Sequence, residues 1–206
     1  MVLAGCLIDR ETEKLFRELG VKDSKMLTDK RREFLAEKIK EHATVFEFVL
    51  AYPNEIDGLN GDGINLNQLE AIKMAEIINK INKDFDKIKV IIDCPSVGIA
   101  KWQDYLKTHI KNLSNLEIVC EHKADKNYVS VSAASIIAKS VREKEMALLQ
   151  EKYGKEIGSG YCSDPVTCKF LEKHAETHRH EGIFRQTWET WKRACANLGQ
   201  KKLFLF

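Results

Sequence analysis

EHKADKNYVSVSAASIIAK, residues 121–139, is the stretch that decides the fold. It follows a strand-like apolar run and leads into a long predicted helix at about 127–152. Asp125 stands between lysines just before that helix, whose first turns are mostly Ser, Ala and Ile. Small side chains let a helix pack closely against a sheet, so the helix would fix the position of the carboxylate that precedes it. An acid at this place can also be a simple helix cap, because the helix dipole favours it.

Outward from this stretch, apolar runs alternate with helical periodicity. The runs predict strands, and the last part of the chain is all helical. This pattern predicts an α/β fold, a sheet sandwiched by helices, with the strands covered on both faces because their apolar runs are continuous. The predicted strands are 2–8, 43–52, 88–93 and 116–121, and the predicted helices are 28–41, 65–81, 98–111, 127–152, 164–178 and 186–196.

The composition is that of an ordinary globular protein of one domain, or of one domain with a small appendage. The chain has 206 residues, of which 44% are hydrophobic and 31% charged. No apolar run approaches the roughly 20 residues of a membrane span. The six cysteines form no CxxC pair, and we expect reduced thiols and a cytoplasmic location. The net charge of +2 predicts no polyanion partner by itself.

A second carboxylate closes another predicted strand. The run IKVIIDC places Asp93 where the apolar strand 88–93 stops. Functional groups of open α/β sheets gather beyond the carboxyl ends of strands, although an acid there can also cap the next helix. Two such acids, Asp93 and Asp125, suit hard divalent cations, which prefer carboxylate oxygens.

Two loops carry groups suited to a nucleic acid. In GSGYCSDP, residues 158–165, two glycines let the backbone approach a ligand and expose Tyr161, and Pro165 opens a helix. In VKDSKMLT, residues 21–28, two lysines and a serine are suited to gripping phosphates. Either segment can also be a plain surface turn. Residues 22–40 hold seven Lys/Arg against four Asp/Glu, which indicates a basic patch or a solvated helix face.

Taken together, these segments resemble the ribonuclease HII family, most closely its archaeal members. The resemblance implies an RNase H-like mixed sheet flanked by helices, with a helical C-terminal part. It divides the chain into a core at 1–145, a helical part at 146–197 and a tail at 198–206. The matching segments, in family order, are VKDSKMLT (21–28), INLNQLEA (64–71), IIDC (91–94), EHKADKNYVSVSAASIIAK (121–139), Arg142, GSGYCSDP (158–165) and RQTWET (185–190).

The resemblance also implies a function: endonucleolytic cleavage of the RNA strand of RNA–DNA hybrids, including single ribonucleotides in duplex DNA, by a monomer with no membrane partner. Family members use Mg²⁺ or Mn²⁺ held by four acids, of which Asp93 matches the third and Asp125 the fourth. In the family, two metals flank the scissile phosphate, and cleavage leaves 5′-phosphate and 3′-hydroxyl ends. Tyr161 matches the tyrosine that packs on the sugar at the RNA–DNA junction. A backbone-contacting loop is matched by Lys22, Ser24 and Lys25.

The sequence departs from the family at its start. The family's first strand carries an adjacent Asp-Glu pair and a Gly-Arg-Gly loop, and MVLAGCLID aligns just after them. Two divalent cations bring four positive charges, against two negative charges from Asp93 and Asp125. A central strand would be missing too, which would leave its neighbours with unpaired backbone groups.

Two explanations fit this departure. In the first, the given start is an internal methionine of a complete enzyme. In the second, this is the true chain, and it is a clamp-associated module that binds hybrids with little cleavage. We favour the first, because every downstream site element is intact.

Two further clusters stand near the C-terminus. In QKKLFLF, the last seven residues, Gln200, Leu203 and Phe206 have the spacing of peptides that dock on the replication sliding clamp, although a packed or frayed end is the alternative. In HAETHRH, residues 174–180, His174 and His178 have the spacing of zinc ligands. The segment is not HExxH, and we expect a solvated helix face.

Overall fold

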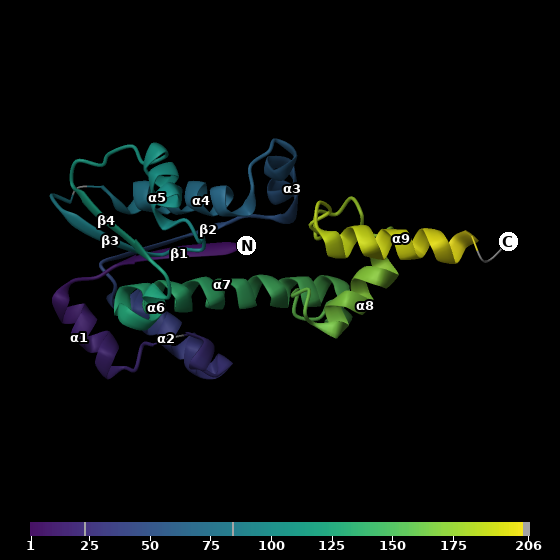
Figure 1. Ribbon diagram of the computed structural model, residues 1–206. Coiled ribbons are helices and arrows are strands. Elements are labelled where there is room, and N and C mark those ends of the chain that lie inside the picture. Colours follow the sequence, from purple (N-terminus) through teal and green to yellow (C-terminus); the bar gives the residue numbers. More distant parts are fainter. Residues whose placement is uncertain (23, 84, 204–206) are drawn as a thin grey trace. The chain divides into compact units, whose positions relative to one another are not determined.

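The structure, a computed structural model, describes residues 1–22, 24–83 and 85–203, with side chains to residue 197 (Figure 1). In chain order the elements are β1 (Val2–Leu7), α1 (Arg10–Glu18), η1 (Ser24–Met26), α2 (Asp29–His42), β2 (Val45–Leu50), α3 (Pro53–Gly61), α4 (Leu66–Ile81), β3 (Ile88–Asp93), α5 (Ile99–Thr108), β4 (Leu116–Glu121), α6 (Ala124–Asn127), α7 (Val129–Tyr153), η2 (Lys155–Ile157), α8 (Pro165–His174) and α9 (Glu189–Leu203). None of the helices in this described part combines the length and apolarity that a membrane crossing requires.

The chain forms two compact units. The larger one comprises residues 2–50 and 66–141 and holds the four strands of the described residues, and the smaller one comprises Met1 with residues 51–65 and 142–206. The predicted boundaries at 145/146 and 197/198 stay predictions.

In the larger unit, the four described strands form two pairs. β1 and β2 are antiparallel, in a register that sets Val2 opposite Leu50. β3 and β4 are parallel and set Asp93 opposite Glu121. Among the described residues, neither β1 nor β3 has a hydrogen-bonded strand on its other side. The proposal that a further central strand belongs here stays a prediction.

Helices cover the strands from two sides of this unit. One core joins α2 and the first half of α7 around Leu35, Ile39 and Ile136, with Ala4 and Cys6 of β1 packed against it. The other joins α4 and α5 around Ile78, Trp102 and Leu106, with strands β3 and β4. In Figure 1, α4 and α5 lie on one side of the strands and α2 and α7 on the other. The first turns of α7 can approach the strands because Ser132 and Ala133 are small and buried.

The smaller unit is built around the turn that leads into α9. The carboxylate of Asp57, on α3, accepts hydrogen bonds from the backbone N–H of Gln186 at 2.5 Å and from the Thr187 hydroxyl at 2.6 Å. Trp191 is 5% exposed and its ring lies 5.1 Å from that of Phe184. One carboxylate therefore ties two segments that are 130 positions apart in the chain.

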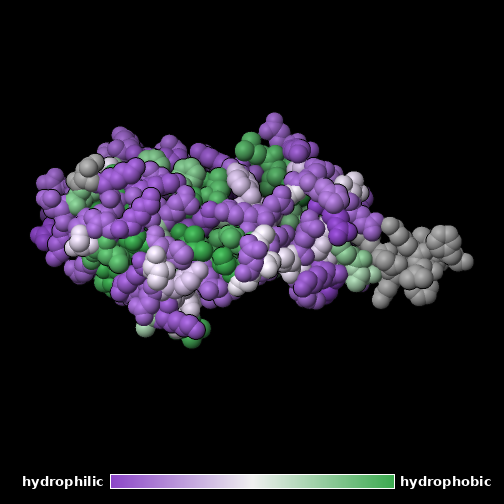
Figure 2. Space-filling model, turned by 90° about the horizontal axis from the view of Figure 1, so that it is seen from above, coloured by the Kyte–Doolittle hydropathy of each residue, from purple (hydrophilic) through white to green (hydrophobic). Residues whose placement is uncertain are grey.

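The structure confirms the predicted fold class and corrects several details. The predicted strands 88–93 and 116–121 have the bounds of β3 and β4, and all six cysteines are free. The predicted sandwich is confirmed, because helices pack on the strands from two sides. The strands are less buried than their continuous apolar runs suggest, since β1 is half-buried throughout and Phe48 of β2 is 39% exposed. The face in Figure 2 is mostly hydrophilic, with hydrophobic residues showing between. Helices α1 and α3 were not predicted, and α9 extends beyond the predicted end at 196.

Candidate active site

Asp93 lies at the carboxyl end of β3, as predicted. Its side chain is exposed, whereas its neighbours Ile92 and Cys94 are buried. Its carboxylate accepts a hydrogen bond from the backbone N–H of Ala124 at 3.3 Å. Pairing with β4 continues past this point, since the N–H of Cys94 donates to the carbonyl of Glu121 at 2.9 Å. The end of β3 is therefore held against the start of α6.

Asp125 lies in the first turn of α6 and is only 8% exposed. Lys123, directly before the helix, has φ of +60°, a left-handed conformation that is uncommon outside glycine and that turns the chain from β4 into α6. The Ser132 hydroxyl donates to the backbone carbonyl of Asp125 at 2.5 Å, which joins this turn to α7. Helix α7 therefore holds the backbone turn that carries Asp125.

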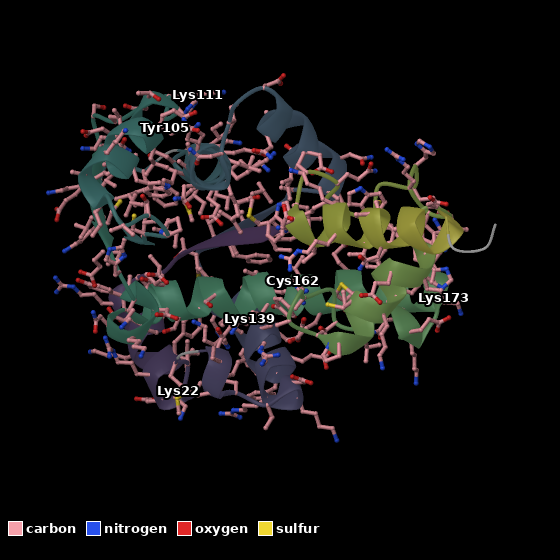
Figure 3. All side chains as sticks on the ribbon, turned by 45° about the vertical axis from the view of Figure 1, so that its right-hand side comes forward. Lys22, Tyr105, Lys111, Lys139, Cys162 and Lys173 are labelled. Atoms are coloured by element: carbon pink, nitrogen blue, oxygen red, sulfur yellow. The ribbon has the colours of Figure 1, made fainter. Side chains whose placement is uncertain are left out.

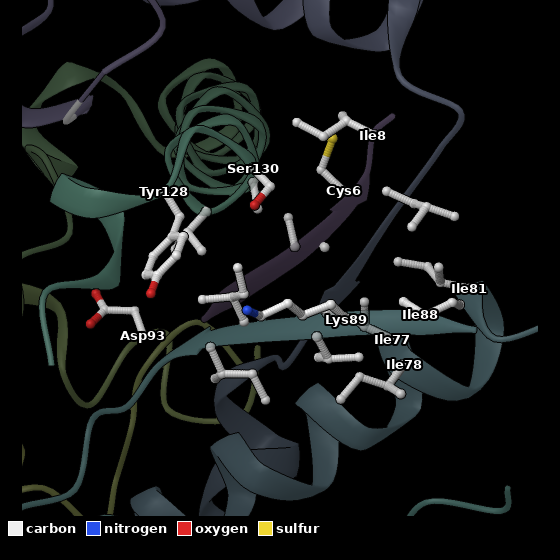
Figure 4. A pocket seen from close by; sticks show the side chains of 18 of the residues that line it. Cys6, Ile8, Ile77, Ile78, Ile81, Ile88, Lys89, Asp93, Tyr128 and Ser130 are labelled. Carbon is white, nitrogen blue, oxygen red and sulfur yellow. The ribbon is translucent and has the colours of Figure 1, made fainter. Parts of the chain in front are cut away.

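The two carboxylates lie at one cleft of about 630 Å³ in the larger unit. Its walls are β1, β3, the first half of α7 and one face of α4, including Ile77, Ile78 and Ile81. Figure 4 shows Asp93 and Tyr128 at one end of this cleft and Ile81 and Ile88 at the other. Because Asp93 is bonded to the residue next to Asp125, the two acids share the same end. The chain thus brings together the two acids that the sequence singled out.

The carboxylates of Asp93 and Asp125 supply only part of the ligand set of a divalent cation. Asp125 is 8% exposed and lines the cleft, so its carboxylate can reach an ion bound there. Mg²⁺ keeps several waters and is commonly held by one or two carboxylates together with substrate phosphates. The described residues contain no group of three or more His, Cys, Asp or Glu side chains that could hold a metal. The two acids can therefore hold an ion only with water or substrate.

The loop at 21–28, which is predicted to bind phosphates, lies near α7 in the larger unit. Lys22 and Lys25 are exposed, and Figure 3 shows Lys22 at the surface beside α1 and α2. Ser24 is fully buried, and its hydroxyl lies 2.8 Å from the hydroxyl of Ser135 on α7. The Ser24 hydroxyl is therefore turned inward. Its contact with a nucleic acid, like those of the two lysines, stays a prediction.

Tyr161 belongs to the smaller unit, in the loop between η2 and α8. Its ring is 52% exposed, and the guanidinium of Arg142 lies 3.9 Å from the ring centroid. Arg142 also donates to the carbonyl of Ser159 at 2.8 Å. One face of the tyrosine ring is therefore supported. Its predicted packing on the sugar at the RNA–DNA junction stays a prediction, and Asp93 and Asp125 belong to the other unit.

Asp164 is a residue whose role the sequence did not reveal. It caps α8, and Pro165 lies in the first turn of that helix as predicted. In addition, its carboxylate accepts hydrogen bonds from the backbone N–H and the hydroxyl of Ser159, each at 2.7 Å. These bonds lower the pKa of Asp164 to about 2. The only signal in the sequence was an acid that follows a glycine-flanked serine by five positions.

The two C-terminal clusters have different outcomes. The side chains of Gln200 and Leu203, and all of Phe206, lie outside the described residues. The prediction of a solvated helix face at 174–180 is wrong, because α8 ends at His174. The imidazoles of His174 and His178 are half-buried against Phe170, with ring centroids 4.7 and 6.1 Å from that of the phenylalanine. Aromatic packing therefore explains the histidines.

Comparison with known proteins decides the family. The model of the ribonuclease HII family matches residues 1–191. The chain belongs to the ribonuclease HII family. It is 38% identical over 194 residues to the ribonuclease HII of Methanobrevibacter smithii, covering 92% of this chain and 88% of the relative. It is also 38% identical to that of Methanocaldococcus jannaschii, covering 100% of this chain and 92% of the relative.

Solved structures agree with this assignment. The ribonuclease H2 of Pyrococcus horikoshii superposes with a TM-score of 0.79 at 33% identity, covering 94% of this chain and 97% of that one. The ribonuclease HII of Archaeoglobus fulgidus, solved in complex with PCNA, gives 0.76 at 33% identity, covering 94% and 95%. Bst-RNase HIII, at 21% identity, has a TM-score of 0.80 over 95% of this chain and 64% of that one, and shows the fold alone.

Proposed function

We propose that this chain is an endonuclease that cleaves the RNA strand of RNA–DNA hybrids, including single ribonucleotides embedded in duplex DNA. The observation that carries the proposal is the shared position of Asp93 and Asp125 at one end of the cleft in a ribonuclease HII chain. The substrate class follows from the family. The chemistry follows from two carboxylates that can present a divalent cation to a phosphate.

The two acids have different roles in this proposal. Asp125 is buried and rigidly supported, so its carboxylate would fix the position of the ion. Asp93 is exposed and its carboxylate is oriented by the Ala124 N–H, so it would be accessible to a bound substrate. Bound Mg²⁺ or Mn²⁺ would supply Lewis-acid chemistry at the scissile phosphate, leaving 5′-phosphate and 3′-hydroxyl ends.

Substrate binding would use the exposed cations and the supported ring. Lys22 and Lys25 would contact phosphates, together with the Ser24 backbone, so binding would weaken as salt is raised. The exposed face of Tyr161 would pack on a sugar or base, since an aromatic ring stacks on any nucleotide. A cytoplasmic location is part of the proposal and is supported by the six free thiols.

A second function, hybrid binding with little cleavage, is favoured by the acid count. Asp93 and Asp125 supply two negative charges, and the described residues offer no third ligand. Metal catalysis contributes several kcal/mol, so we expect residues 1–206 to cleave roughly 10²–10⁴-fold more slowly than the Methanobrevibacter smithii relative. Such a difference would leave hybrid binding intact.

One experiment tests both functions. The 206-residue chain is incubated with Mn²⁺ or Mg²⁺ and a DNA duplex that carries one ribonucleotide, and both cleavage and binding are measured. We expect single-site cutting that Asp125→Asn lowers by about 10²-fold or more, whereas Asp104→Asn on the exposed face of α5 leaves it unchanged. Binding without any Asp125-dependent cutting would select the second function. Absence of both binding and cutting would refute the proposal.

The proposal includes a sliding-clamp partner. It is supported by the spacing of Gln200, Leu203 and Phe206 and by the Archaeoglobus fulgidus relative, which was solved with PCNA. The chain should elute alone as a monomer and should co-elute with an archaeal clamp. Phe206→Ala should abolish co-elution, whereas Lys202→Ala, at a position between the anchors, should preserve it. Unchanged co-elution of the Phe206 variant would count against the partner.

A further inference from the structure

Two glycines with positive φ shape the loop that carries Tyr161. Gly158 and Gly160 have φ of +72° and +74°, where side chains are strained. A Cβ at Gly158 would lie 2.6 Å from the hydroxyl of Thr167 and 2.7 Å from the carboxylate of Asp164. The loop is therefore pressed against the first turn of α8.

The Asp164 carboxylate is the centre of these contacts. One of its oxygens accepts from the Ser159 N–H and hydroxyl at 2.7 Å and from the Thr167 hydroxyl at 3.2 Å. Its other oxygen accepts from the Val166 N–H at 2.9 Å. The backbone closes the same turn, because the Asp164 N–H donates to the carbonyl of Tyr161 at 3.0 Å. Both ends of the segment 159–161 are thus fixed by one residue.

Arg142 connects this turn to the ring of Tyr161. Its guanidinium donates to the carbonyl of Ser159 and lies 3.9 Å from the centroid of the Tyr161 ring. The same Arg142 is thus oriented by Ser159, which in turn donates two hydrogen bonds to Asp164. The opposite face of the ring is left for a ligand, since Tyr161 is 52% exposed.

We propose that Asp164 is a positioning residue that holds the Tyr161 ring ready for a nucleotide of the bound hybrid. The inference rests on the proposed function, because Tyr161 is the residue that would touch the substrate. Asp164 would act only through Tyr161. Without the Asp164 carboxylate, the Tyr161 ring would adopt several orientations. Ordering the ring on binding would then lower the affinity for the substrate.

The test is a double-mutant cycle on binding, measured by fluorescence anisotropy with a labelled duplex that carries one ribonucleotide. No divalent metal is added, so that no strand is cut. We expect Tyr161→Ala to weaken binding about tenfold and Asp164→Asn about fivefold. In the Tyr161→Ala background, Asp164→Asn should change the affinity by less than about twofold. Glu172→Gln, an exposed acid on the same helix, is the matched control and should change nothing.

Each other outcome has a defined meaning. An equal loss from Asp164→Asn in both backgrounds would show a general structural role and overturn the inference. So would a normal affinity for Asp164→Asn when Tyr161→Ala binds weakly, with the proposed function left standing. A normal affinity for Tyr161→Ala would remove the proposed role of Tyr161 itself. If Asp164→Asn fails to fold, Ser159→Ala, which removes one bond to the carboxylate, replaces it in the same cycle.

Discussion

The backbone N–H of Ala124 donates a hydrogen bond to the carboxylate of Asp93 across 3.3 Å, and this bond joins the end of β3 to the first turn of α6. The two residues are 31 positions apart in the chain. Since Asp125 follows Ala124 directly, the bond also sets the two candidate ligands at the same end of the cleft.

The first prediction concerns the charge of Asp93. Asp93→Asn keeps an oxygen that can accept from the Ala124 N–H but removes the negative charge. We therefore expect an unchanged unfolding temperature and an affinity for Mn²⁺ lowered about tenfold or more, measured by isothermal titration calorimetry. Asp104→Asn serves as the control, because it removes an exposed acid on α5. Equal Mn²⁺ affinities for the two variants would exclude Asp93 as a ligand.

The second prediction concerns the packing of β1 against α4. A Cβ at Gly5 would lie 2.6 Å from Cγ2 of Ile77 and 3.0 Å from Cδ1 of Ile81. Gly5→Ala should lower the free energy of unfolding by about 1–3 kcal/mol, because the methyl group overpacks this contact. Gly58→Ala, in helix α3 with nothing within 4 Å of the new Cβ, should leave stability equal or slightly higher. Chemical denaturation of both variants measures the difference, and equal midpoints would contradict the described packing.

The third prediction concerns pH. Hydrogen bonds from Ser159, Val166 and Thr167 lower the pKa of Asp164 to about 2 from an ordinary value of 3.8. Since the folded pKa lies below the unfolded one, the stabilisation is fully present above about pH 4 and is lost as the pH falls towards 2. The wild-type unfolding temperature should fall more steeply over this range than that of Asp164→Asn. Parallel curves for the two proteins would show that the carboxylate is not held as described.

The fourth prediction concerns the cation under the Tyr161 ring. Arg142→Lys keeps the positive charge but loses the planar guanidinium that lies 3.9 Å from the ring centroid. A cation–π contact at an exposed site contributes about 0.5–1 kcal/mol, so hybrid affinity should fall about two- to fivefold. Arg193→Lys, an exposed arginine on α9, should have no effect. An affinity unchanged in the Arg142 variant would mean that charge alone matters there.

Part of the fold followed directly from the sequence. Strands β3 and β4 were predicted to the residue because their apolar runs end at acids, Asp93 and Glu121. The sequence pattern does not predict helix α1, because this helix is short and mostly charged, although Asp9 caps it. Helix α3 was missed because Pro53 and two glycines suggest a loop, although proline is favoured in a first helical turn.

The sequence predicts those parts of the site that depend on residues close together in the chain. The sequence indicates Asp93 and Asp125 because Asp93 ends one predicted strand and Asp125 follows another, and strand ends meet at one edge of a sheet. The inward turn of Ser24 was not predictable, because it depends on Ser135, which is 111 positions away. The contacts of Asp164 depend on positive φ angles at Gly158 and Gly160, which a glycine permits but does not require.

Asp93 and Asp125 are proposed to hold one divalent cation together. The most direct measurement is a crystal structure of the 206-residue chain grown with Mn²⁺, with data collected at the manganese absorption edge. We expect an anomalous peak within about 2.0–2.6 Å of a carboxylate oxygen of both residues. An anomalous map with no peak at the Asp93 end of the cleft, in crystals whose carboxylates are free of lattice contacts, would contradict the proposal.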